Sequence, residues 1–224
     1  MHDAPSHDQS EAISPSDSAV ARIVVFDFDG TITTDDTFRL FLKYYKGPVS
    51  YGLKILSLLP IFMAYGLRII DRNKVKAHVI RRFFKGEAMA SIQNRADSFA
   101  SDVIPGLIRP AAEDALIKAQ KQEKSGGDSL YICSASIGPY LRAYFEPRGV
   151  NKILATELKS ESNICSGEIE GYNIWGEGKV RRILAEFAPQ EVNIIEAYGD
   201  SRGDRELLNA AEASFYRPFR LSPT

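Results

Sequence analysis

The sequence predicts an α/β fold, in which a doubly wound parallel sheet carries an inserted helical cap and a small β-hairpin. Four short apolar runs have the composition of buried strands: 21–26, 129–133, 192–198 and, more weakly, 213–216. Segments of helical periodicity lie between them, and polar residues follow the first three runs. Strands that alternate with helices favour a parallel sheet with helices on both faces, so ligands are expected at the carboxyl ends of the strands.

The start of the chain, 1–18, mixes Ser, Asp, His and Pro without an apolar run, and we expect a disordered tail there. It lacks the basic start and the apolar segment of a secretory signal, so a cytoplasmic location is expected.

The two cysteines, Cys133 and Cys165, are too few for a disulfide framework and lack metal-ligand spacing. We therefore expect free thiols in apolar surroundings, as in proteins of a reducing compartment.

The stretch 37–103 separates the first two predicted strands and is far longer than a crossover needs. It contains helical patterns at 49–70 and 75–99, so an inserted helical cap is the simplest interpretation. The predicted core domain then consists of 19–36 and 104–224, on either side of this cap.

A second departure from plain alternation is the segment 153–174, which has period-two fragments around Asn163 and Gly167. We interpret it as a β-hairpin beside the site.

Charged residues make up 25% of the chain and the formal net charge is −1, so there is no global field to attract nucleic acid. We expect no nucleic-acid partner and a specificity that comes from a local site.

The strongest chemical signal is the pair Asp27 and Asp29, which follows the first strand and precedes Gly30. Residues i and i+2 of an extended chain point to the same side, so both carboxylates can face one small volume. Two like charges that close shift each other's pKa, and a divalent cation or a shared proton would relieve the repulsion. The alternative is a strand that runs into an ordinary Asp-Gly turn.

Polar residues also follow the other predicted strands. Ser134 could offer its hydroxyl and the next backbone N–H groups to a phosphate oxygen, or could only cap a helix. Lys179 begins a helix after a glycine-rich turn, where its ammonium could neutralise a phosphate, or it could be a surface lysine. Asp200 and Asp204 suit a hard cation bound through oxygen, or they could be a loop acid and a helix cap.

The order of these motifs, DFDGTIT, then Ser134, then Lys179, then GDSRGD, resembles the haloacid dehalogenase (HAD) superfamily of phosphotransferases over about 22–219. The helical insert before SAS is similar to that of the phosphoserine phosphatase-like branch (subfamily IB). Within this branch the chain looks most similar to bacterial phosphatases that include a C-type phosphatidylglycerophosphatase. The resemblance implies a Rossmann-like core and a magnesium-dependent phosphomonoester phosphatase that acts through an aspartyl-phosphate.

The resemblance also implies a role for each matching residue. Asp27 would be the nucleophile, and Asp29 would act as general acid and then as general base. Mg²⁺ would be held by Asp27, by Asp29 through its backbone carbonyl, and by Asp200. Asp204 would orient Lys179 or a metal-bound water. The groups implied to bind the phosphate oxygens are those of Thr31, Ser134, Ala135 and Lys179.

Three features depart from the phosphoserine phosphatase pattern. Asp36 stands where those enzymes carry a substrate-binding glutamate, and Gly203 stands where they often have asparagine. Ser134, Ala135 and Ser136 replace their Ser-Gly-Gly. The chemistry is expected to survive these changes, but they weaken the case for phosphoserine as the substrate.

The apolar segment 53–70, interrupted only by Lys54 and Arg68, is the main clue to the substrate. It is marginally short for a membrane-spanning helix, and Pro60 lies in its middle. It could contact a bilayer peripherally or cover a lipid tail, which would make the protein membrane-associated, or it could simply pack the cap. A lipid phosphate such as phosphatidylglycerophosphate is the first candidate substrate, and a small soluble phosphomonoester is the alternative.

Five basic residues follow the apolar segment, and such a cluster is typical of a solvated face: Arg72, Lys74, Lys76, Arg81 and Arg82.

Three functions other than hydrolysis are compatible with some of these residues. A receiver-type signalling domain has similar residue types, but it is shorter and lacks a cap. A silent phosphate-binding scaffold would be expected to have lost at least one of the central charged residues, and all are present. A non-hydrolytic phosphotransferase would carry the same motifs, and the oligomeric state is not predicted.

Overall fold

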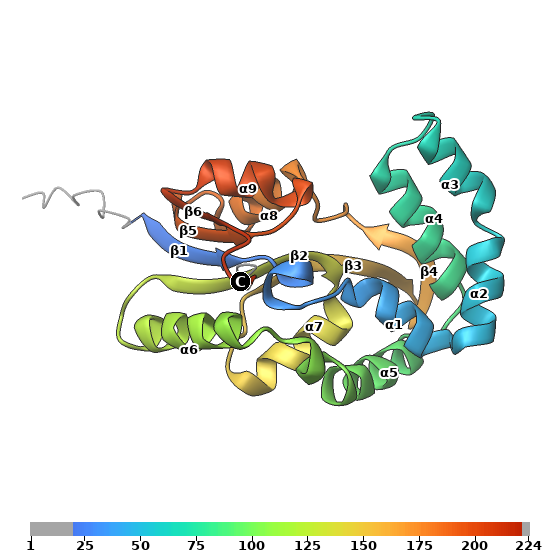
Figure 1. Ribbon diagram of the computed structural model, residues 1–224, viewed down its shortest axis with the longest axis horizontal. Coiled ribbons are helices and arrows are strands. Elements are labelled where there is room, and N and C mark those ends of the chain that lie inside the picture. Colours follow the sequence, from blue (N-terminus) through green and yellow to red (C-terminus); the bar gives the residue numbers. More distant parts are fainter. Residues whose placement is uncertain (1–19, 221–224) are drawn as a thin grey trace, which may run out of the picture.

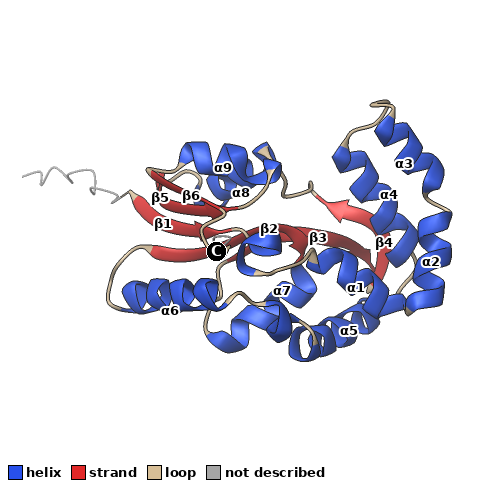
Figure 2. Cartoon of the chain, viewed as in Figure 1, coloured by secondary structure: helices blue, strands red, loops and turns tan. Residues whose placement is uncertain are grey.

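The computed structural model describes residues 20–220, so the tail predicted at 1–18 lies outside the described residues. Its centre is a six-stranded sheet with the order β4-β3-β2-β1-β5-β6 (Figure 2). Neighbouring strands are parallel except for the antiparallel pair β3 and β4. The strand bounds are Ala21–Phe26 (β1), Ser129–Ile137 (β2), Ile153–Glu161 (β3), Ile164–Glu170 (β4), Val192–Gly199 (β5) and Ala213–Tyr216 (β6). The predicted α/β fold is confirmed.

Helices cover both faces of the sheet (Figure 1). One face carries α6 (Pro110–Lys124) and α7 (Gly138–Phe145), and the other carries α8 (Glu177–Phe187) and α9 (Arg205–Ala210). The side chains of β1 alternate accordingly: Val24 and Phe26 belong to the core on one side, and Ile23 and Val25 to the core on the other. Because both faces are buried, the strand reads as a continuous apolar run, which is the pattern that the sequence analysis used.

The segment between β1 and β2 is helical, as expected. It contains α1 (Thr37–Lys46), α2 (Pro48–Leu56), α3 (Leu59–Gly66), α4 (Arg72–Phe84) and α5 (Met89–Asp102). Between residues 20 and 220 there are also four short helical turns: η1 Phe28–Ile32, η2 Ile104–Leu107, η3 Glu146–Arg148 and η4 Arg202–Asp204.

The helical pattern at 49–70 forms two helices rather than one. They meet at a break of two residues and are bent by 52° to each other. Pro60 lies in the first turn of α3, where its missing N–H leaves no hydrogen bond unmade. No single helix of residues 20–220 has the length and apolarity to cross a membrane, whereas α2 and α3 meet both criteria when they are joined.

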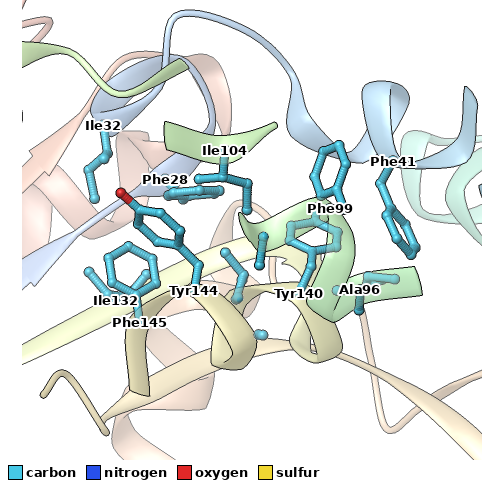
Figure 3. Packing of buried hydrophobic residues seen from close by; sticks show 14 of the residues in the cluster. Phe28, Ile32, Phe41, Ala96, Phe99, Ile104, Ile132, Tyr140, Tyr144 and Phe145 are labelled. Atoms are coloured by element: carbon cyan, nitrogen blue, oxygen red, sulfur yellow. The ribbon is translucent and has the colours of Figure 1, made fainter. Parts of the chain in front are cut away.

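The inserted helices share one apolar core with the α6 and α7 face of the sheet (Figure 3). The ring of Tyr140, from α7, lies 5.1 Å from that of Phe41 and 5.4 Å from that of Phe99. These two rings of the insert are also 5.3 Å apart and fully buried. Ring pairs at such distances add to the stabilisation from area burial, so this part of the insert is fixed to the core.

The predicted β-hairpin is formed by β3 and β4. Its turn residues Ser162 and Asn163 have φ of 50° and 64°, as a two-residue type I′ turn requires. The start of β4 and the hairpin turn are hydrogen-bonded to the junction of α4 and α5: the N–H of Gly86 donates to Cys165 O at 2.9 Å, and the N–H of Met89, the first residue of α5, donates to Asn163 O at 2.8 Å. The insert therefore protects the edge of the sheet that would otherwise have open backbone groups.

Candidate active site

The candidate active site lies where the carboxyl ends of β1, β2 and β5 meet. These strands are adjacent and parallel, so the residues at their ends share one edge of the sheet. Asp27 follows β1, Asp200 follows β5, and Ser134 and Ala135 belong to the end of β2. Lys179 comes from the first turn of α8. The structure therefore brings together residues that are up to 173 positions apart in the sequence.

Strand β2 is longer than the sequence analysis predicted. It continues past Cys133 to Ile137, with a shift in register against β3 between Ser134 and Ile137. A bulge of this kind re-aims side chains at a strand end, which a period-two pattern does not reveal. Ser134 is fully buried, and its Oγ accepts the N–H of Ser136 at 3.0 Å. Its own hydroxyl proton is not used in that bond and is free to be donated.

The centre of the site is a buried ammonium between two carboxylates. Lys179 Nζ donates to Asp27 Oδ1 at 2.5 Å and to Asp204 Oδ1 at 2.6 Å. Asp27 is 5% exposed, and the other two residues are 1% exposed. Thr31 Oγ1 donates to the second oxygen of Asp27 at 2.9 Å. Asp27 is therefore held in one orientation by two donors, and the hydroxyl of Thr31 is engaged with it.

Asp204 is the most completely satisfied acid of the site. Its Oδ2 accepts hydrogen bonds from the N–H of Asp200 at 3.2 Å and from the N–H and the hydroxyl of Ser201 at 2.9 and 2.8 Å. With Lys179 on its other oxygen, both carboxylate oxygens are occupied. This geometry suits a residue that positions Lys179, as the family resemblance implies.

The one ammonium at the centre of the site cannot neutralise both of its carboxylate partners. Burial raises the pKa of Asp27 to about 7, against the opposing attraction of Lys179 and with a further increase from the charge of Asp204. Burial disfavours the charged form of Lys179, but its two carboxylate partners outweigh this and raise its pKa above the usual value. Burial likewise disfavours ionised Asp204, yet Lys179 outweighs it and lowers the pKa of Asp204. A second cation beside Asp27 would allow both carboxylates to be ionised.

Asp200 lies close enough to Asp27 to help bind such a cation. One carboxylate oxygen of each of Asp27, Asp200 and Asp204 lies within 4.8 Å of the others. The approach of Asp200 to the η1 turn depends on Gly30, which has φ +77° and whose Cβ, if present, would lie 2.6 Å from Asp200 Oδ2. Buried carboxylate oxygens that carry excess negative charge are the ligands that Mg²⁺ prefers, so the donor set fits the metal implied by the resemblance.

The carboxylate of Asp29 points toward α1 and β2. Its Oδ1 accepts the backbone N–H and the hydroxyl of Thr37 at 2.7 and 2.5 Å, and its Oδ2 accepts the hydroxyl of Ser136. The two aspartates of the motif therefore bind different partners, although they belong to one site. Burial raises the pKa of Asp29, and the charge of Asp36 adds to this, against the opposing hydrogen bonds from Ser136 and Thr37. A raised pKa increases the fraction of Asp29 that can donate a proton.

Two basic residues near the site were not singled out from the sequence. Lys76, from α4, is half-buried and lies 3.2 Å from the centre of the Phe38 ring. Burial lowers its pKa to about 7, although the charges of Asp29 and Asp36 oppose this. Its sequence context, a run of basic residues, indicated only a solvated face. Arg220 donates to Asp200 Oδ2 at 2.5 Å from beyond β6, and its sequence context gives no signal of this contact.

The cap and the core also meet around Trp175. The guanidinium of Arg72 lies 5.3 Å from the centre of its ring, and Asn173 donates to Asn73 at 2.8 Å. A Cβ on Gly203 would lie 2.3 Å from Trp175 Nε1, so the indole fills the space that a side chain at this position would need. A cavity of about 880 Å³ opens beside these contacts, between α4 and the start of α8.

Comparison with known proteins assigns the chain to a family. Residues 24–209 match the family of haloacid dehalogenase-like hydrolases. The chain belongs to this family. Protein CicA of Caulobacter vibrioides is 35% identical over 204 residues, which cover 90% of this chain and 88% of that protein. These matches confirm the prediction that the protein is an enzyme of the HAD superfamily.

Solved structures agree on the fold. A Bordetella pertussis Tohama I protein of unknown function is similar with a TM-score of 0.69 and 18% identity, covering 85% of this chain and 87% of that one. A phosphoserine phosphatase in apo form has a TM-score of 0.57 and 15% identity, covering 88% and 86%. A probable phosphoserine phosphatase from Vibrio cholerae has a TM-score of 0.64 and 13% identity, covering 88% and 55%.

Proposed function

We propose that this HAD hydrolase is a magnesium-dependent phosphomonoester phosphatase with Asp27 as its nucleophile. The observation that supports this most directly is the geometry of Asp27. Its carboxylate is buried, fixed by Thr31 and Lys179, and close to Asp200. A fixed carboxylate beside a buried ammonium and a cation site is what attack on a negatively charged phosphoryl group requires.

In the first step, a carboxylate oxygen of Asp27 forms a bond to phosphorus while the bond from phosphorus to the substrate's alcohol oxygen breaks. Asp29 gives its proton to that departing oxygen, a role that its raised pKa favours. In the second step, water attacks phosphorus, Asp29 takes a proton from it, and the bond to Asp27 breaks. The products are the free alcohol and inorganic phosphate, and both aspartates return to their starting states.

The remaining residues hold the reacting groups in place. Asp27 and Asp200, with the backbone carbonyl of Asp29, would bind Mg²⁺, which when bound offsets the repulsion between the nucleophile and the phosphoryl oxygens. Lys179, Ser134 and the backbone of Ala135 would bind the transferring oxygens, and Thr31 would orient the nucleophile. Asp204 fixes the position of Lys179.

The substrate that we favour is a lipid phosphate such as phosphatidylglycerophosphate. Its support is the apolar outer surface of α2 and α3, which suits a protein that works at a bilayer. A small soluble phosphomonoester is the second candidate, and its support is the polar environment of Asp29. There the carboxylates of Asp29 and Asp36 and the ammonium of Lys76 interact.

The test is release of inorganic phosphate from phosphatidylglycerophosphate in micelles, phosphoserine and small sugar phosphates, with magnesium or with chelator. We expect turnover that requires magnesium and that is lost in Asp27→Asn. The matched control is Asp35→Asn, which removes an exposed carboxylate from the loop between η1 and α1. Turnover that persists in Asp27→Asn would exclude the proposed nucleophile. Release that appears only with an added alcohol acceptor would indicate a phosphotransferase.

A further inference from the structure

An exposed apolar surface lies on the outer side of α2, α3 and the residues just beyond α3, and we call it the cap face. Eight large apolar side chains between 49 and 69 are 45% to 76% exposed. They are Val49, Leu53, Leu56, Leu59, Met63, Tyr65, Leu67 and Ile69. Exposed apolar residues are unremarkable singly, but eight of them between 49 and 69 indicate a contact surface.

The exposure of the cap face is not the result of a detached segment. Other side chains of this segment pack inward: Leu58, at the break between the two helices, is buried, and Ile55 and Phe62 contact the main core. The ring of Tyr51 lies 5.9 Å from that of Phe83 on α4. The two helices are thus anchored along one side, and their other side is presented outward at the edge of the molecule (Figure 1).

The segment of the chain that contains the cap face is strongly basic. Residues 37–86 contain eleven Lys or Arg and one acid, Asp71, which gives a net charge of +10. The rest of the chain contains seventeen Lys or Arg and twenty-eight Asp or Glu, which gives −11. The neutral overall composition therefore conceals a basic segment that coincides with the exposed apolar side chains. Arg68, Arg72 and Lys74 lie directly beyond α3, next to Leu67 and Ile69.

We propose that the cap face docks onto an anionic lipid bilayer, with its apolar side chains among the acyl chains and its cations at the headgroups. Apolar area and basic charge on one face are the two attractions that bind peripheral helices to anionic membranes. A second copy of the chain is a poorer partner, because two cap faces of the same positive charge would repel each other.

The inference rests on the proposed function in one respect, which is that docking would bring the site to a lipid phosphate. Helix α4 connects the two features: α3 packs on it, and its Lys76 interacts with the charge of Asp29. Docking itself does not require catalysis. The Asp27→Asn variant should therefore bind vesicles as the unchanged protein does.

The experiment is flotation of the full chain with vesicles of phosphatidylcholine alone, or of equal parts phosphatidylcholine and phosphatidylglycerol. We expect binding to the anionic vesicles and much weaker binding to the neutral ones. The double variant Leu53→Gln, Met63→Gln should lower binding about tenfold or more. The double variant Arg68→Gln, Lys74→Gln should lower binding to anionic vesicles by roughly fivefold for each cation removed.

The matched control is Ile117→Gln with Leu184→Gln, which changes two exposed apolar residues on α6 and α8, away from the cap face. It should bind as the unchanged protein does. The proposal is overturned if the unchanged chain does not float with anionic vesicles, or if the cap-face and control variants bind equally. It is also overturned if the cap-face variants abolish a dimer, seen by sedimentation, while vesicle binding is absent. Turnover of a soluble phosphomonoester by Asp27→Asn would reject the proposed function and leave the docking result unaffected.

Discussion

The active site and the cap face depart in opposite ways from the rule that charged side chains are exposed and apolar side chains are buried. At the active site, charged side chains are buried: Lys179 and Asp204 are each 1% exposed. On the cap face, apolar side chains are exposed, and Leu53 and Met63 reach 63% and 67%. Burying a charge costs desolvation free energy, and a group of exposed apolar side chains adds nothing to the core, so each indicates that something other than folding has determined the sequence there. The difference is that the buried charges have partners within the chain, whereas the cap face has none among the described residues.

The largest effect should follow from removing the nucleophile. Asp27→Asn should lower kcat for any phosphomonoester substrate by roughly 10³-fold or more, because no other carboxylate occupies that position. The measurement is steady-state phosphate release with magnesium present. Vesicle binding measured on the same sample should not change, which would separate the active site from the cap face. A parallel loss of both would show that the two regions depend on each other.

The second effect concerns the stability of the buried charges. Lys179→Met leaves Asp27 and Asp204 facing each other without their shared ammonium, and should lower the free energy of unfolding by about 3–5 kcal/mol. The control is Lys159→Met, which removes an exposed ammonium paired with Glu168 and should have a much smaller effect, because solvent screens that pair. Both values come from denaturant unfolding. Equal effects would contradict the importance assigned to burial.

The third effect compares buried and exposed apolar residues of the same insert. Phe41→Ala should lower the free energy of unfolding by about 3–5 kcal/mol, because Phe41 is fully buried among aromatic rings. Leu53→Gln should change it by less than about 0.5 kcal/mol, because Leu53 faces outward. Thermal or denaturant unfolding of both variants provides the comparison. A large loss in Leu53→Gln would mean that the cap face supports the fold.

The smallest effect should be the pH dependence that Lys76 imposes. Its pKa is lowered to about 7, so the ammonium is present below that pH and is lost as the pH rises through it. The KM for an anionic substrate should therefore increase above about pH 7, and Lys76→Met should have the higher KM already at low pH, by about tenfold. Lys118→Met, which removes an exposed lysine on α6, serves as the control. The phosphate group of the substrate itself titrates near pH 6, so the pH dependence from this source will be present in every variant.

Much of the architecture followed from sequence patterns. The apolar runs at 21–26 and 192–198 identified β1 and β5, because strands buried on both faces leave an uninterrupted signal. The hairpin was predicted from period-two fragments and is confirmed in β3 and β4. The family is confirmed as well, because its motifs are strings of adjacent residues. The boundaries proposed for the cap and the cytoplasmic location stay predictions.

Some features of the structure were not predicted from the sequence, and each has a physical reason. Strand β2 extends past Cys133 through a bulge, and a bulge breaks the periodicity that would have revealed it. Helical periodicity alone could not distinguish one helix at 49–70 from the two bent helices that form. The roles of Lys76 and Arg220 depend on contacts with residues distant in the sequence, and nothing local distinguishes these side chains from solvated ones.

The contacts of Trp175 have a practical consequence. It is the chain's one tryptophan, and its indole ring is placed between Arg72 of the insert and Gly203 of the core. Any movement of the insert away from the sheet must change the polarity around this ring and the distance to the guanidinium. The protein thus contains an intrinsic fluorophore between the insert and the core, and its emission would report any such movement without an added label.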